Sequence, residues 1–170
     1  MSKTLTKPLL GRYPVKIMGG NQGADNYRRI VEIEKQSQTN GWTIADFRKT
    51  IESHGVLGTV IFDEQDEKII AYYVYEMEDN GINLLNFAVD PNYRRKGLGT
   101  AMMKLLKNRL HLRRSYLTAN VRESNLQMQL FLKANQFLAT KVEHNYYVDY
   151  DGRGNKKIED AYCFSYPNLT

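Results

Sequence analysis

The stretch of sequence that decides the fold of this chain is Val89-Asp90-Pro91-Asn92-Tyr93-Arg94-Arg95-Lys96-Gly97-Leu98-Gly99-Thr100. An apolar strand ends at Val89, a turn with two glycines follows, and an amphipathic helix begins. Gly97 and Gly99 let the backbone approach a ligand without interference from a Cβ atom. The first-turn N–H groups of a helix and its dipole attract an anion, and three basic side chains and a threonine hydroxyl lie beside them. The segment therefore predicts a pyrophosphate site.

Two other phosphate motifs do not fit this segment. A Walker A loop needs G-x-x-x-x-G-K-[ST], and a dinucleotide-binding turn needs G-x-G-x-x-G. A plain glycine turn with solvated basic residues is the remaining alternative. We favour the pyrophosphate site because the strand, the turn, the charges and the helix all agree.

The elements on either side follow from periodicity and turn residues. Upstream, we expect a strand at about Tyr13 to Met18, a helix from Asp25 to about Gln38, and a helix capped by Thr43 to about Ser53. Three strands follow as a meander, at about Val56 to Asp63, Lys68 to Glu76 and Ile82 to Val89. After Pro91, apolar residues at helical spacing predict a helix of about fourteen residues. The remaining elements are a strand at Tyr116 to Val121, a helix at Asn125 to Ala134, and a hairpin of about Phe137 to Tyr147 and Ile158 to Ser165.

This order, β-α-α-β-β-β-α-β-α-β-β, predicts an α/β fold. We expect a mixed, mostly antiparallel sheet with a parallel strand pair at the cofactor site and helices on both faces. One domain over residues 13–167 and a flexible tail over residues 1–12 fit a chain of 170 residues.

Composition narrows the class of protein. The chain is 42% hydrophobic and 25% charged, as is usual for soluble globular proteins. Because no run of 18 apolar residues occurs, we expect no membrane contact. The single cysteine, Cys163, indicates a reducing cytoplasm and supports no cysteine-based metal site. The net charge of +5 suits either a nucleic-acid binder or a protein that holds a phosphate-rich cofactor. We predict the second, with no metal and no direct nucleic-acid binding.

The deciding segment resembles the R-x-x-G-x-G/A signature of the GNAT superfamily of N-acetyltransferases, which takes the pyrophosphate of coenzyme A. The resemblance extends to Val121-Arg122-Glu123-Ser124-Asn125, which is similar to the V-R-x-S-N segment of the family. Ile33-Glu34 with Trp42-Thr43 and Phe47, and Asn145-Tyr146-Tyr147 with Glu159-Asp160-Ala161, resemble motifs of RimI-like ribosomal-protein alanine N-acetyltransferases. The match covers about Tyr13 to Phe164.

The resemblance implies acetyl-CoA as the cosubstrate and assigns residues to it. The backbone of one strand would pair with the pantetheine arm and polarise the thioester carbonyl, and Asn125 would contact the cofactor. The implied cofactor-binding residues are Phe87, Ala88, Val89, Arg94, Arg95, Lys96, Gly97, Leu98, Gly99, Thr100 and Asn125.

The family's proton carriers are absent at their usual positions. The general base, a Glu two residues before the Arg of V-R-x-S-N, corresponds to Asn120, and the general acid, a Tyr, corresponds to Leu132. We name Glu34, Tyr146 and Tyr147 as candidate catalytic residues instead. Alternatively, Glu34 is a structural carboxylate and the tyrosines are ordinary strand aromatics. Glu123 is interpreted as a solvated loop charge, and His54, His111 and His144 as surface or packing residues.

Three functions remain open. The first is acetylation of the N-terminal α-amine of a protein or peptide, with a ribosomal protein among the candidate partners. The second is acetylation of a small amine such as a polyamine or amino acid. The third is a catalytically weak module that binds acetyl-CoA. The intact phosphate segment favours the first two, and the hairpin motifs favour a peptide.

Overall fold

A computed structural model describes residues 13, 15–18, 24–38, 40–65 and 67–167. The expected tail, residues 1–12, lies outside the described residues. The described part forms two compact units. One comprises residues up to Tyr75 together with Asn86–Asn108, and the other comprises Glu76–Leu85 together with residues from Arg109 onward. Because β4 runs unbroken from one unit into the other, we retain a single domain over residues 13–167 as a proposal.

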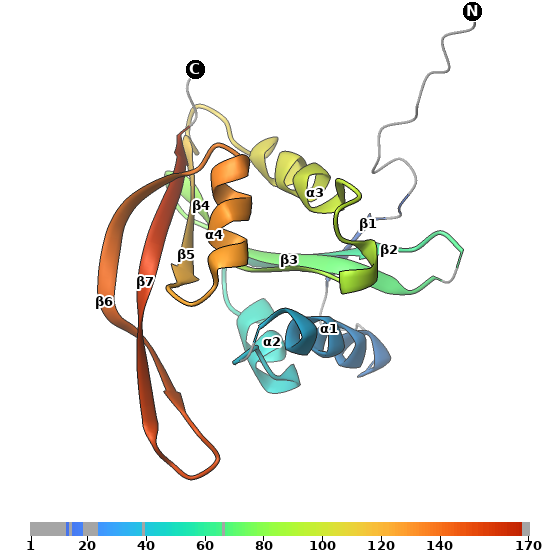
Figure 1. The fold of residues 1–170 in the computed structure, drawn as a ribbon. Helices are drawn as coiled ribbons and strands as arrows, with labels where there is room; N and C mark the ends of the chain where they lie inside the picture. Colours follow the sequence, from blue (N-terminus) through green and yellow to red (C-terminus); the bar gives the residue numbers. More distant parts are fainter. Residues whose placement is uncertain (1–12, 14, 19–23, 39, 66, 168–170) are drawn as a thin grey trace, which may run out of the picture. The chain divides into compact units, whose positions relative to one another are not determined.

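The predicted order of strands and helices is confirmed, with a short 3-10 helix added (Figure 1). The elements are β1 (Val15–Met18), α1 (Ala24–Ser37), α2 (Ile44–Ile51), β2 (Val56–Phe62), β3 (Ile69–Met77), β4 (Gly81–Val89), η2 (Pro91–Tyr93), α3 (Leu98–Lys107), β5 (Tyr116–Arg122), α4 (Leu126–Ala134), β6 (Leu138–Tyr150) and β7 (Lys156–Pro167).

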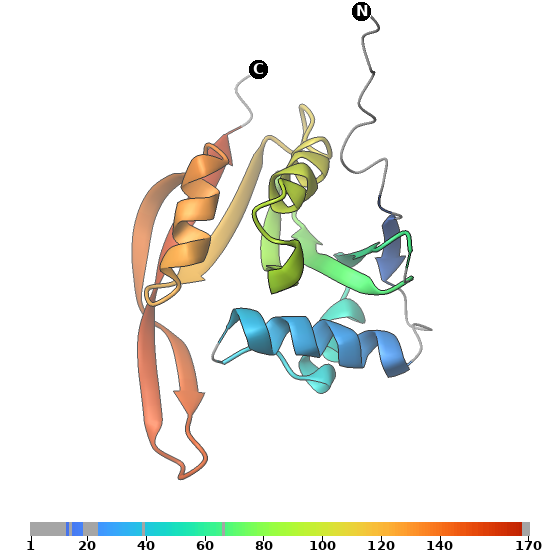
Figure 2. The same cartoon turned by 45° about the vertical axis from the view of Figure 1, so that its right-hand side comes forward.

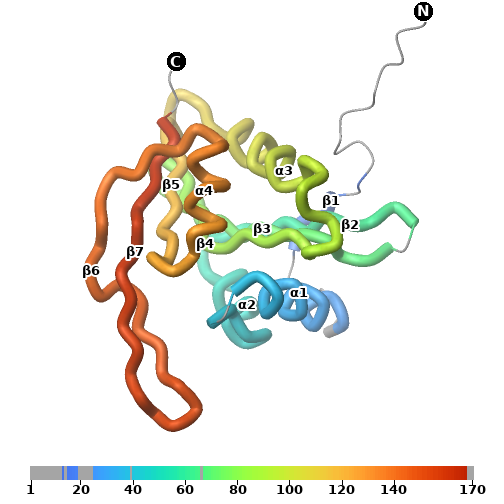
Figure 3. The backbone as a smooth tube through the Cα atoms, viewed as in Figure 1, coloured from blue at the N-terminus to red at the C-terminus, as the bar shows by residue number. Residues whose placement is uncertain are grey.

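The strands form one mixed sheet in the order β1-β2-β3-β4-β5-β7-β6. β4 and β5 are parallel, with register from Gly81↔Tyr116 to Leu84↔Ala119, whereas β5 and β7, and β6 and β7, are antiparallel. The predicted fold class and its parallel pair are therefore confirmed. The tube in Figure 3 traces the long β6–β7 hairpin, in which the two strands run side by side.

In the first unit, α1 and α2 lie on one side of β2 and β3, and α3 lies on the other (Figure 1). The helices can cover both faces because the strands carry apolar residues continuously: seven successive residues of β3, Ile69 to Tyr75, are buried. The most buried residues of this unit include Ile30, Ile33, Phe47, Val60, Ile61, Ile70, Tyr72, Val74, Met102 and Met103.

In the second unit, α4 lies beside β5 and β7 (Figure 2). The burial of β5 alternates, with Leu117, Ala119 and Val121 buried, as expected for a strand with two unlike faces. Leu132 from α4 and Phe137 after it complete this core, and the Phe137 ring lies 5.6 Å from that of Tyr166.

Local sequence signals predicted the start of α2 correctly but not the start of α1 or the length of α3. Thr43 caps α2 as expected, in a capping box with Asp46. Asp25 was expected to cap α1, but the helix begins at Ala24, so Asp25 lies in its first turn. α3 has 10 residues instead of about fourteen; it ends at Lys107, before the last leucine of its apolar stripe.

Candidate active site

The turn before α3 has the geometry that an anion site requires. Gly97 is the N-cap of α3 in the left-handed conformation, with φ of 81°, and no side chain among the described residues caps the helix there. Arg95 is also left-handed, with φ of 61°. A left-handed residue suits glycine because other side chains are strained there. The first-turn amides of α3 are thus left to a ligand, and a pyrophosphate fits this segment.

The turn is anchored at its start by Asp90. This residue is 2% exposed, its backbone N–H donates to the Ile70 carbonyl at 2.8 Å, and its carboxylate pairs with the Arg29 guanidinium. The other carboxylate oxygen accepts from Asn92 N at 2.9 Å, capping η2. α1, β3 and the turn are therefore tied together before the phosphate segment begins.

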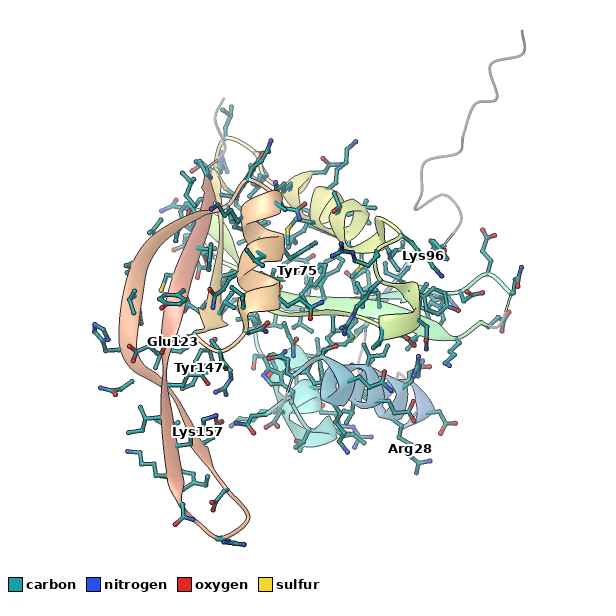
Figure 4. The ribbon with its side chains drawn as sticks, in the orientation of Figure 1. Arg28, Tyr75, Lys96, Glu123, Tyr147 and Lys157 are labelled. Atoms are coloured by element: carbon teal, nitrogen blue, oxygen red, sulfur yellow. The ribbon has the colours of Figure 1, made fainter. Side chains whose placement is uncertain are left out.

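Two of the three basic residues of the turn help to build it. Arg94 donates from Nε to the Val89 carbonyl and from Nη2 to Ser37 Oγ, both at 2.8 Å. Lys96 donates to the Asn92 carbonyl at 3.1 Å and lies 5.2 Å from the Tyr93 ring centre (Figure 4). Arg95 is exposed. Their predicted contacts with a cofactor remain predictions.

The strand before the turn carries the amides expected to polarise a carbonyl. Phe87 N–H donates to its neighbour Asn86 Oδ1 at 2.7 Å. This bond gives the Phe87 amide an acceptor within the protein. The roles expected for Phe87, Ala88 and Val89 remain predictions. Asn86 itself is 6% exposed and was not assigned a role from the sequence. Asn86 is one of two asparagines in a strand that is otherwise apolar, and this was the signal that could have identified it.

Glu34 lies at the centre of a buried polar cluster. Its side chain is 0% exposed. The carboxylate accepts from Trp42 N and Asn86 Nδ2, both at 2.9 Å, from Gln38 Nε2 at 3.3 Å, and from the Tyr72 hydroxyl. We call Glu34, Gln38, Trp42, Tyr72 and Asn86 the Glu34 cluster. It joins α1, the loop before α2, β3 and β4.

The surroundings of Glu34 suit a fixed structural carboxylate. Burial and the neighbouring Glu34 raise the pKa of Tyr72 well above its ordinary value, so the phenol stays a donor. Gly41 packs directly on the side chain, because a Cβ at that position would lie 2.4 Å from Glu34 Cγ. A role for Glu34 as a proton acceptor remains a prediction.

The second unit contains the other predicted residues. Asn125 is the N-cap of α4, and its Oδ1 accepts from Met128 N at 3.0 Å. Leu132 is 0% exposed within the core, so that position serves packing. The Asn120 carbonyl accepts from the Tyr147 hydroxyl at 2.9 Å. Asn120 and Tyr147 were predicted separately, and the structure brings them together.

The two tyrosines differ in their surroundings. Burial raises the pKa of Tyr147 to about 12, with Tyr146 adding to the effect, so its phenol is a donor and not a base near neutral pH. Tyr146 is 47% exposed, and its ring packs edge-on against that of Tyr147, with centroids 4.9 Å apart.

The remaining titratable candidates lie at the surface. Glu123, His54 and His111 are exposed, as interpreted from the sequence. His144 is also exposed, but its Nδ1 lies 2.7 Å from Asp160 of the hairpin motif. Asp160 also accepts from Asn145 N at 2.8 Å, and this bond together with His144 lowers the pKa of the carboxyl. Asp160 thus holds the β6 irregularity between Glu143 and Tyr147.

Neither a metal-binding cluster nor a membrane-spanning helix is present among the described residues. In this part of the chain no three His, Cys, Asp or Glu side chains are grouped so that they could hold a metal ion. None of the helices described is long and apolar enough to cross a membrane.

Comparisons with known proteins agree with the geometry. The chain is 33% identical to a [ribosomal protein bS18]-alanine N-acetyltransferase of Escherichia coli (strain K12) over 104 residues, which are 61% of this chain and 67% of that protein. The crystal structure of the ribosomal-protein-S18-alanine N-acetyltransferase from Escherichia coli has a TM-score of 0.71 at 23% identity, covering 93% of this chain and 95% of that one. A GNAT family acetyltransferase from Elizabethkingia anophelis with acetyl-CoA bound has a TM-score of 0.66 at 12% identity, covering 92% and 98%.

Family membership follows from a match over more than half of the chain. Residues 27–137 match the model of the Acetyltransferase (GNAT) family, a span that includes the anion-binding turn and the V-R-x-S-N segment. The GNAT family uses acetyl-CoA as acyl donor. This chain therefore belongs to the GNAT family and is an N-acetyltransferase.

Proposed function

We propose that this protein transfers the acetyl group of acetyl-CoA to the N-terminal α-amine of a protein or peptide. The observation that carries the proposal is the 33% identity to an alanine N-acetyltransferase that acts on ribosomal protein bS18. A ribosomal protein is accordingly the first acceptor to test. The cytoplasmic location expected from the sequence belongs to the same proposal.

The anion site would hold the diphosphate of the donor. Gly97, Gly99 and the first-turn amides of α3 supply its donors, and Arg95 adds exposed positive charge. In acetyl transfer an N–C bond forms at the thioester carbonyl, the C–S bond breaks, and one proton passes overall from nitrogen to sulfur. Backbone amides within the segment from Phe87 to Val89 would stabilise the charge that develops on the carbonyl oxygen.

The missing base favours an α-amine as acceptor. An α-amino group has a pKa of about 8, whereas a lysine has one of about 10.4, so only the first is appreciably neutral near pH 7. With Asn120 in place of the family's Glu, no carboxylate from that position takes the proton. Tyr147 is no substitute base, because burial raises its pKa to about 12 and its phenol stays protonated. The acceptor's own low pKa therefore offsets the absent base.

A panel of acceptors tests the proposal. It contains peptides with a free α-amine, the same peptides blocked at the N-terminus but carrying an internal lysine, a polyamine and free amino acids. We expect thiol release and a mass increase on the free peptides alone. A preference for small amines would contradict the proposal. Binding of acetyl-CoA without turnover would instead favour the weak module, to which Asn120 and Leu132 point.

The donor site is tested separately by Thr100→Glu. Thr100 is exposed in the first turn of α3, where a negative charge suits the helix dipole but repels a diphosphate. The variant should keep or slightly raise the melting temperature without ligand and lose the stabilisation that acetyl-CoA gives the wild type. Lys104→Glu, one turn further along the same helix, is the matched control and should retain most of that stabilisation. Full stabilisation of Thr100→Glu would contradict the site.

A further inference from the structure

Arg122 is the last residue of β5, and it binds two carboxylates from the hairpin. Its Nη1 and Nη2 donate to Asp149 Oδ2 and Oδ1 at 2.7 and 3.1 Å, and Nη1 also donates to Glu159 Oε2 at 3.2 Å. The guanidinium also lies over the Tyr147 ring, with Cζ 4.1 Å from its centroid. Only 16% of the Arg122 side chain is exposed. The planar fork and the ring contact are both properties that lysine lacks.

The strand register explains why these partners face Arg122. Tyr147 lies directly opposite Glu159, and Asp149 is two residues further along β6, so the three side chains share one face of the hairpin. β5 ends at Arg122, opposite Ala161. The two-stranded ribbon formed by residues 147–150 and 156–159 therefore continues past the end of β5 (Figure 4, where Lys157 lies further along it than Tyr147).

The same ribbon is held at two further points. Glu159 Oε1 accepts from Ser124 N at 2.6 Å, and the Tyr147 hydroxyl donates to the Asn120 carbonyl. Burial alone would raise the pKa of Glu159, but the bonds from Ser124 and Arg122 outweigh it, and the pKa lies below its ordinary value. We call Arg122, Ser124, Tyr147, Asp149 and Glu159 the Arg122 cluster. It attaches the ribbon to the segment that leads into Asn125 and α4.

A two-stranded ribbon alone is marginally stable in water, so these contacts decide how firmly it is placed. These contacts extend from Arg122 to Tyr146, because Arg122 lies over the Tyr147 ring and Tyr147 packs against the exposed Tyr146. We propose that Arg122 is a positioning residue for the acceptor amine: through Tyr147 and the two carboxylates it fixes the ribbon that presents Tyr146. This inference rests on the proposed function and adds to it that the hairpin contacts the acceptor.

The test compares Arg122→Lys, which keeps the charge but loses the fork, with Tyr147→Phe, which keeps the ring and loses its hydroxyl. Arg113→Lys, at an exposed arginine of the same unit, is the control. We expect Arg122→Lys to raise KM for the acceptor peptide about tenfold or more, as for loss of a charge-assisted hydrogen bond, with KM for acetyl-CoA unchanged. Tyr147→Phe should give a smaller rise, and Arg113→Lys none.

Hydrogen exchange of amides in residues 147–150 and 156–159, without substrate, gives an independent readout. Arg122→Lys should lower protection there while leaving β5 protected. Unchanged ribbon protection, or equal changes in both KM values with a lower melting temperature, would overturn the inference as a merely structural effect. If the wild type acetylates only small amines, the proposed function fails, and KM is measured for that amine instead. An unchanged KM in Arg122→Lys would then overturn the inference too.

Discussion

The Glu34 cluster and the Arg122 cluster use opposite means for the same task, which is to join segments far apart in the sequence around one charged side chain. Glu34 is fully buried and is satisfied by uncharged donors. Arg122 is partly exposed and is satisfied by two carboxylates and a ring. A buried charge without enough partners is costly. The stability of the Glu34 cluster therefore depends on complete hydrogen bonding. The stability of the Arg122 cluster depends on ion pairs that solvent and salt can reach.

The difference suggests a division of roles. The Glu34 cluster fixes the loop before α2 and the strand that carries Ala88 and Val89, both inside the first unit. The Arg122 cluster fixes a ribbon that projects into solvent. If the comparison is right, disturbing the first should mainly unfold the protein, and disturbing the second should mainly change how it handles an acceptor.

The largest effect is expected from Glu34→Ala. It leaves the Tyr72 hydroxyl, the Asn86 amide and Trp42 N without their acceptor, so the free energy of unfolding should fall by about 3 kcal/mol or more. Urea denaturation measures this. Glu32→Ala, on the exposed part of the same helix, should change stability by less than about 0.5 kcal/mol. Equal losses in the two variants would show that the buried Glu34 contributes no more to stability than the exposed Glu32.

The next largest effect is expected from a substitution that crowds the Glu34 side chain without changing any charge. Gly41→Ala would place a Cβ 2.4 Å from Glu34 Cγ and 3.0 Å from Cδ, and overpacking of this kind costs about 1–3 kcal/mol. Gly152→Ala is the control, since its Cβ would meet no described atom within 4 Å. We expect it to be neutral or to stabilise by about 0.4–1 kcal/mol. A neutral Gly41→Ala in thermal denaturation would show that the loop moves away from Glu34 without penalty.

A moderate effect should distinguish the clusters by their response to salt. Asp149→Asn removes one charge from the partly exposed Arg122 cluster and should lower stability by about 1 kcal/mol in dilute buffer. That loss should shrink at about 1 M salt, where the Debye length is about 3 Å. The loss from Glu34→Gln should stay the same, because solvent ions do not reach it. If added salt changed the two stability losses equally, the proposed difference between the two clusters would be contradicted.

The smallest effect concerns pH. Burial raises the pKa of Tyr147 to about 12, above the value of about 10 in an unfolded chain. The folded state favours the neutral phenol, so this contribution is complete below about pH 10 and is lost as pH rises toward 12. Because the ring is only partly buried, we expect about 1 kcal/mol or less. The stability difference between wild type and Tyr147→Phe should therefore narrow between about pH 10 and 12, and a constant difference would contradict the assignment.

Much of this molecule could be predicted because its signals are local. Periodicity and turn residues predicted the order of the described strands and α-helices, though not η2, and Thr43 identified the start of α2. The turn with Gly97 predicted an anion site, and the left-handed conformation of Gly97 explains why a glycine stands there. Helix ends were less certain: nothing local in the stripe after Leu98 showed that α3 stops at Lys107.

The sequence by itself determined the family, and it predicted the anion-binding turn and the replacement of the usual base and acid by Asn120 and Leu132. The tertiary structure decided which partners the charged side chains bind, and therefore what each of them does. Asp90, Glu34 and Arg122 bind partners 61, 52 and 37 positions away, and no spacing in the chain reveals such pairs. Whether a carboxylate is a reactive group or a buried anchor depends on the donors that folding brings to it, and those donors come from other strands.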